Sequence, residues 1–326
     1  EEEKKRVKGT IINKFRGDVS ILKPGLRMLE EKINTSVLGV IPYFHLDIED
    51  EDSLTERFRK KSRSGLAKIA VIRLPRISNF TDIAPLEAVD ELDVSYVSNI
   101  SQFGDPDVVI IPGSKNTISD LLWMRQNGLE GKILRHAAKG GIVFGICGGY
   151  QMLGQSISDP TGAEQKGTVR GMGLLPVTTV FEQEKRRTRV SGRFAKVGGA
   201  LAEMSGVCYE GYEIHMGRTV LSKGTVPLVY MEEEGEQRQD GAQSDHVYGC
   251  YMHGIFDMSE TVKTFLAAVL RKKGIDPSKI TVRDRNAYKE EQYDRLASIV
   301  RENLNMEAVY KIIEKGNEAS CSLLSE

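Results

Sequence analysis

The sequence has few cysteines and no long hydrophobic run. Its 326 residues include four cysteines without a CxxC pair, so a disulfide framework is excluded and a reducing, cytoplasmic setting is expected. The longest apolar runs, such as residues 108–111, fall far short of the roughly 20 residues of a membrane span. The first residues read Glu-Glu-Glu-Lys-Lys-Arg with no apolar stretch behind them, so we expect neither a signal peptide nor a membrane partner.

The sequence also has no excess of positive or negative charge. Lys and Arg total 45 against 46 Asp and Glu, a formal charge of −1 with no long basic block, so we expect no nucleic-acid partner. The five histidines form no cluster with Cys or Asp at metal-ligand spacing, so no metal site is expected. The composition, 40% hydrophobic and 28% charged, is that of a globular protein, and the length predicts about two domains.

The first 64 residues read as the end of an α/β domain. Apolar patterning predicts a strand over 8–13, a helix over 23–32 and a strand over 36–42. The acidic and basic residues that follow are typical of a solvated helix and linker. We therefore place a boundary near Ser64 and treat 1–64 as one segment.

Strands and helices alternate regularly from residue 67. Strands are predicted over 68–74, 94–97, 107–112 and 141–146, with helices over 85–92, 118–127 and 129–139. This rhythm predicts an α/β fold with an open, mostly parallel sheet. Strands near 173–180, 226–231 and 246–253 follow, with polar surface loops over 158–167 and 232–245 and a helix over 259–270. These elements define a domain over 65–270, and helices over 290–304 and 306–315 define a C-terminal extension over 271–326.

The most informative stretch is Gly145-Ile-Cys147-Gly-Gly149, which fits the nucleophile elbow with Cys147 in place of serine. In such a strand-to-helix turn, the residues two before and two after the nucleophile must lack side chains. The turn also places the sulfur at a helix N-terminus, where the dipole favours a thiolate. The alternative is a buried cysteine among glycines.

His253 is the best candidate for the base that a cysteine nucleophile needs. It ends the strand predicted over 246–253 and precedes a glycine. His45, beside a turn, and His136, on a predicted helix, are weaker candidates for a catalytic base. By strand alternation Cys250 lies on the opposite face from His253, so we expect Cys250 in the core.

Several motifs carry a family resemblance. The elbow, Gly-Ile-Cys-Gly-Gly-Tyr-Gln-Met-Leu-Gly, resembles the nucleophile motif of class I (triad-type) glutamine amidotransferases. Residues 251–257 are similar to the histidine motif of their cobyric/cobyrinic acid synthase branch, and 209–219 resemble the signature of cobyric acid synthases within it. Residues 111–117 resemble the oxyanion-strand motif, and 288–313 are similar to the C-terminal helices of the same branch.

The resemblance implies a flavodoxin-like domain that hydrolyses glutamine through a thioester. Cys147 would be the nucleophile and His253 the acid and base. The oxyanion donors would be backbone N–H groups at Gly113 or Ser114 and at Gly148. Gln151 would bind glutamine, with a core or capping amide as the alternative. We leave open whether His215, near Glu213, faces the active site or the partner domain, or is simply a satisfied strand histidine.

One position departs from the commoner class I pattern, in which a glutamate two residues after the histidine orients it. Here that residue is Ile255, as the branch implies, so the orienting group is unassigned and a dyad is expected.

The resemblance also implies an ATP-using partner. Segment 1–64 resembles the end of a P-loop, dethiobiotin-synthetase-like α/β domain, in which Asn13 would contact adenine; capping a strand end is its alternative role. No G-x-x-x-x-G-K-[S/T] loop occurs in the sequence, so we expect this chain to bind no cofactor itself. ATP and Mg²⁺ would serve a preceding domain or a separate chain.

The reaction that the resemblance implies is the amidation of a corrinoid in cobalamin biosynthesis. It converts adenosylcobyrinic acid a,c-diamide to adenosylcobyric acid at carboxylates b, d, e and g. Three alternatives remain within this fold: another synthase of the branch (the a,c-diamide synthase or a glutaminase subunit for cell-wall lipid amidation), a plain cysteine hydrolase, and a non-catalytic binding module.

Overall fold

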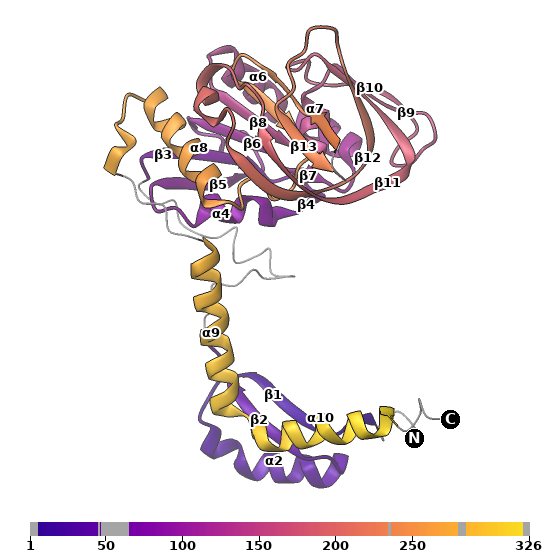
Figure 1. Ribbon diagram of the computed structural model, residues 1–326, viewed down its shortest axis with the longest axis vertical. Coiled ribbons are helices and arrows are strands. Elements are labelled where there is room, and N and C mark those ends of the chain that lie inside the picture. The colour runs from indigo at the N-terminus through magenta and orange to yellow at the C-terminus, as the bar shows by residue number, and fades with distance from the viewer. Residues whose placement is uncertain (1–5, 45, 47–64, 234–235, 280–284, 322–326) are drawn as a thin grey trace. The chain divides into compact units, whose positions relative to one another are not determined.

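The computed structural model describes residues 6–44, 46, 65–233, 236–279 and 285–321, which form two compact units (Figure 1). The smaller unit takes in the described residues before position 50 and those from 286 on, and the larger unit takes in those between. The boundary predicted near Ser64 lies outside the described residues. Segment 271–326, which we expected to be a single C-terminal extension, is divided between the two units. Across the described residues, no helix combines the length and the apolar character that crossing a membrane requires.

A six-stranded sheet forms the centre of the larger unit. Its order is β15-β16-β8-β6-β3-β5, and all neighbouring pairs are parallel except β15 with β16. The parallel strands, in chain order, therefore lie 2-1-3-4-5, which is the flavodoxin-like arrangement. This confirms the predicted α/β fold with its mostly parallel sheet. The bounds are β3 Ala67–Ile72, β5 Leu92–Val97, β6 Val108–Ile111, β8 Ile142–Ile146, β15 Ala242–Ser244 and β16 Val247–Cys250.

The helices of this unit fall into two contacting groups. α4 contacts α8, while α5 contacts both α6 and α7. Strands β6 and β8 are buried along their whole length, as expected for central strands of a parallel sheet. The helix predicted over 85–92 was wrong in its extent, because only one turn forms and Leu92 already pairs with Ala67 in the sheet. The bounds are α4 Ala84–Glu87, α5 Thr117–Gln126, α6 Leu129–Ala138, α7 Gly148–Leu153 and α8 Ser259–Lys272, with 3-10 turns η1 Phe80–Ile83, η2 Gly199–Met204 and η3 Pro277–Lys279.

A second sheet, mostly antiparallel, occupies the β-rich half and lies to one side of the parallel sheet (Figure 1). Its longest strands, β11 and β12, pair with each other. The loop predicted over 232–245 was wrong: β14 pairs with β13, and β15 joins the central sheet. The polar composition that predicted a loop belongs to β14. This strand lies at the edge of its sheet, where its side chains are partly exposed. The bounds are β9 Ser156–Asp159, β10 Gly167–Arg170, β11 Val177–Phe194, β12 Cys208–Leu221, β13 Val229–Glu233 and β14 Glu236–Asp240, beside a short pair, β4 Ile77–Ser78 and β7 Gly113–Ser114.

The smaller unit confirms the predicted strand–helix–strand pattern at the N-terminus. β1 (Thr10–Phe15) and β2 (Val37–Pro42) are parallel and are joined by α2 (Val19–Ile33). The Asp18 side chain caps α2 by accepting the Ser20 N–H at 2.8 Å. Helices α9 (Arg285–Asn303) and α10 (Met306–Cys321) complete the unit, and the Asn305 N–H donates to the Leu38 carbonyl of β2 at 2.8 Å.

Candidate active site

Cys147 lies in the strained turn that its flanking glycines predict. It follows β8 and precedes α7, with φ 50° and ψ −107°, a conformation that non-glycine residues rarely adopt. A Cβ at Gly145 would lie 2.7 Å from the Tyr150 nitrogen, and one at Gly149 would lie 2.0 Å from the Ile111 carbonyl oxygen. Both distances are too short for a side chain, so the elbow can form only with glycine at these positions. The Cys147 side chain is 7% exposed.

His253 lies just after β16 and is buried. Its Nδ1 is 2.7 Å from Asp82 Oδ2, and the other oxygen of Asp82 accepts the Gly254 N–H at 2.8 Å. Burial lowers the pKa of His253, but the Asp82 hydrogen bond and the neighbouring Cys147 outweigh it and raise that pKa to about 10. His253 Nε2, the nitrogen on the other side of the ring, is buried and, apart from the neighbouring Cys147 thiol, has no hydrogen-bond partner among the described residues.

The expected dyad is therefore corrected to a triad-like arrangement. Asp82 lies in η1 and is 2% exposed, and sequence reasoning missed it because 171 residues separate it from His253. One feature of the sequence could have indicated Asp82. Asp82 follows the first strand of the parallel sheet, and the carboxyl ends of parallel strands lie along the same edge as the nucleophile.

The predicted oxyanion groups lie together beside this turn. A Cβ at Gly148 would lie 3.0 Å from the Ser114 nitrogen, and one at Gly113 would lie 3.0 Å from His253 Cε1. The Ser114 hydroxyl donates to buried Asp120 at 2.7 Å, which leaves the backbone as the group that faces the elbow. The structure thus brings Gly113, Ser114 and Gly148 together with the nucleophile.

Gln151 lies one turn beyond Cys147 on α7 and is 2% exposed. Its Oε1 accepts the Thr117 hydroxyl at 3.2 Å, and its Nε2 donates to the Tyr251 hydroxyl at 3.0 Å. The amide is thus held from both ends, with its orientation set by its neighbours.

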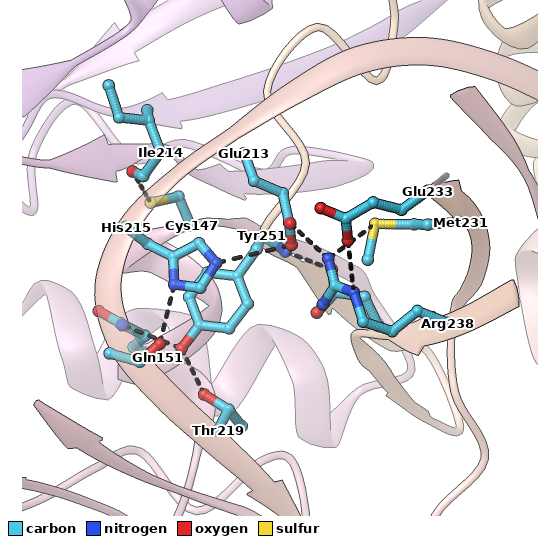
Figure 2. A network of polar contacts seen from close by, with 12 residues as sticks. Cys147, Gln151, Glu213, Ile214, His215, Thr219, Met231, Glu233, Arg238 and Tyr251 are labelled. Carbon is cyan, nitrogen blue, oxygen red and sulfur yellow. Dashed lines mark hydrogen bonds and ion pairs between the residues drawn. The ribbon is translucent and has the colours of Figure 1, made fainter. Parts of the chain in front are cut away.

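Strand β12 runs past the nucleophile and carries His215. The Cys147 thiol donates to the Ile214 carbonyl at 3.6 Å, and the His215 ring stacks on Tyr251 (Figure 2). His215 therefore lies in the polar network around the site, with both of its ring nitrogens directed at groups of its own strand. On the same strand, the Tyr212 ring stacks on His253 with centroids 5.3 Å apart.

Asn13 is not part of this site. It lies on β1 of the smaller unit, where it is exposed, and its Oδ1 accepts the Lys14 N–H at 2.9 Å. No group of three or more His, Cys, Asp or Glu side chains suited to a metal ion occurs among the residues that the structure describes.

Comparison with known proteins identifies the family of this chain. The model of a family described as the CobB/CobQ-like glutamine amidotransferase domain matches residues 68–261. A cobyric acid synthase of Ruminiclostridium cellulolyticum is 55% identical over 322 residues, covering 98% of this chain and 63% of that protein. One from Lachnoclostridium phytofermentans is 46% identical over 330 residues, covering 97% and 64% respectively. The chain thus spans less than two thirds of these curated relatives. Because the family match covers more than half of the chain, this protein belongs to the CobB/CobQ-like glutamine amidotransferase domain family.

Proposed function

We propose that this chain hydrolyses glutamine at Cys147 and supplies the ammonia to an ATP-dependent amide ligase. The observation that carries the proposal is Cys147 on a strained elbow, beside a buried histidine whose second nitrogen contacts a buried carboxylate. Nucleophile, base and orienting group in this order are the arrangement that acyl transfer requires. The family supplies glutamine as the acyl donor.

The first half-reaction forms a thioester. His253 donates Nδ1–H to Asp82, which leaves Nε2 to take the Cys147 proton. The Sγ then attacks the side-chain carbonyl carbon of glutamine, and backbone N–H groups at Ser114 or Gly113 and at Gly148 stabilise the oxyanion. As the C–N bond breaks, the His253 imidazolium protonates the nitrogen, and ammonia leaves.

Hydrolysis of the thioester completes the cycle. Neutral His253 takes a proton from water, whose oxygen attacks the acyl carbon and releases glutamate. The proton then returns to the Cys147 sulfur. The raised pKa of His253 favours its role as acid in the first half-reaction, because the ring stays charged until the leaving group needs the proton. Gln151, held between Thr117 and Tyr251, would contact the bound glutamine.

The ligase reaction belongs to a larger assembly. The relatives named cobyric acid synthase extend well beyond the part that this chain matches, and the sequence lacks a phosphate loop. We therefore propose that ATP and Mg²⁺ act on a preceding domain or a second chain. That part would activate the b, d, e and g carboxylates of adenosylcobyrinic acid a,c-diamide for attack by ammonia. Asn13, proposed to contact adenine, belongs to the portion that would complete this domain.

Glutamate release tests the proposal directly. The chain is assayed with glutamine, alone and with the part of the Ruminiclostridium cellulolyticum relative that it does not span, plus ATP and the corrinoid diamide. We expect release from the unmodified chain and from a Cys208→Ser control, since Cys208 is an exposed thiol, and none from Cys147→Ala. Amidated corrinoid is expected only when the added part is present. A folded chain that releases no glutamate under any condition refutes the proposal and favours a non-catalytic binding module.

A further inference from the structure

Strand β12 forms one wall of the site at two points. Its Ile214 carbonyl accepts the Cys147 thiol at 3.6 Å. Two residues beyond His215, the backbone at Gly217 lies so close to Gln151 that a Cβ there would be 2.3 Å from the Gln151 Nε2. The position of this strand therefore sets the space around both the nucleophile and the amide proposed to bind glutamine.

His215 lies between these two points and joins β12 to Tyr251. The two rings are nearly parallel, with centroids 3.7 Å apart and 14° between their planes. His215 Nδ1 is 2.8 Å from the Gly217 carbonyl, and because a carbonyl can only accept, Nδ1 carries a proton. The hydroxyl of Tyr251 accepts from Gln151 at 3.0 Å. Tyr251 thus contacts both the His215 ring and the Gln151 amide.

The far edge of the His215 ring faces a buried carboxylate. Its Nε2 lies 3.5 Å from Glu213 Oε1, and Glu213, which is fully buried, forms an ion pair with Arg238 (Figure 2). Arg238 also faces Glu233 on β13 at 3.5 Å. Removing Arg238 would leave a buried carboxylate without its cation, so this ion pair holds Glu213 in place beside the His215 ring. Nε2 is directed at Glu213, which leaves His215 outside the proton transfers of the elbow.

We propose that His215 is a positioning residue for glutamine recognition. By stacking on Tyr251 it holds the hydroxyl that orients the Gln151 amide, and by its bond to Gly217 it holds β12 against that amide. The proposal rests on the glutaminase function proposed above. It assigns His215 to the affinity for glutamine and leaves acid–base chemistry to His253.

The test separates the stacking of His215 from its hydrogen bond. His215→Phe keeps an aromatic face for Tyr251, whereas His215→Asn keeps a donor near the Nδ1 position and loses the ring. We expect KM for glutamine to rise about tenfold in His215→Ala and His215→Asn and to stay within about threefold in His215→Phe. The change in kcat and in the shape of its pH profile is expected to be small. The control is His136→Ala, which removes a partly buried histidine with a similar 3.1 Å bond to a carbonyl, that of Ile142.

A double variant tests the path through Tyr251. Tyr251→Phe removes only the hydroxyl, and we expect it to raise KM as His215→Ala does, with little further rise when both changes are combined. Equal KM values for His215→Phe and His215→Ala would overturn the proposal. So would a fully additive double variant, or a shifted pH profile of kcat.

Alkylation keeps the two proposals distinguishable. Iodoacetamide labelling of the Cys147 peptide is followed by mass spectrometry with increasing glutamine, and the half-protecting concentration is recorded. Protection in the unmodified chain that is weakened about tenfold in His215→Ala supports the inference. Equal protection in both refutes the role of His215 alone, and no protection in the unmodified chain overturns the proposed function together with it.

Discussion

Replacing Asp82 with asparagine removes one charge from the site and changes its volume very little. Asp82 uses both oxygens, one on His253 Nδ1 at 2.7 Å and one on the Gly254 N–H at 2.8 Å. An asparagine retains one acceptor, and its amide group can donate to the histidine. That reversal moves the ring proton to Nε2, where it blocks acceptance of the Cys147 proton.

The magnitude follows from these two losses. General acid–base catalysis contributes about 10²- to 10⁴-fold, and the corresponding carboxylate-to-amide change in the serine protease triad costs about 10⁴. We therefore expect kcat/KM for glutamine to fall by about 10²- to 10⁴-fold. Without Asp82, burial dominates and lowers the pKa of His253 from about 10. Because the imidazolium is lost as pH rises through that pKa, the decline of kcat at high pH is expected to begin at a lower pH in the variant.

The assay is glutamate release between pH 6 and 10, with thermal unfolding measured in parallel. The raised folded-state pKa of His253 contributes stability that is complete below about 6.5 and is lost as pH rises through about 10. The variant's deficit in melting temperature is thus expected to be largest near pH 7 and to shrink as the pH approaches 10. Asp93→Asn, at a carboxylate 8% exposed on β5, is the matched control. A kcat/KM within threefold of the unmodified chain would refute the orienting role of Asp82.

Three other substitutions test parts of the site and its support. Gly149→Ala would place a methyl group 2.0 Å from a backbone carbonyl oxygen of β6, so we expect loss of glutaminase activity and a lower melting temperature. The control is Gly131→Ala on α6, which has open space around it and is expected to be neutral or slightly stabilising. Ser114→Ala is expected to lower kcat less than tenfold, because the backbone is the proposed donor; a loss of 10² or more in the glutaminase assay would place the hydroxyl in the reaction instead. Arg238→Met leaves the buried Glu213 carboxylate without its cation, so the free energy of unfolding in urea is expected to fall by about 3 kcal/mol and to recover when Glu213→Gln is added; no recovery would contradict the ion-pair reasoning.

Local patterns predicted the turn that carries Cys147. The elbow could be predicted because its constraint is steric and lies within five residues: Gly145 and Gly149 must lack side chains if Cys147 is to adopt a positive φ. The parallel strands could be predicted because continuous apolar runs are typical of strands buried on both faces. Prediction failed for β14, where an edge strand with polar side chains has the composition of a loop.

The chain sequence thus specifies which residue types are present and how neighbours along the chain constrain each other. This was enough to predict the fold class and the strand-to-helix turn that carries Cys147. Contacts between segments that are far apart in the chain could not be predicted from these local patterns. Asp82 reaches His253 only because strands far apart in sequence end at the same edge of one sheet, and His215 meets Tyr251 only because β12 passes beside the segment that follows β16. Such pairings depend on how sheets and loops pack, and no spacing along the chain encodes them.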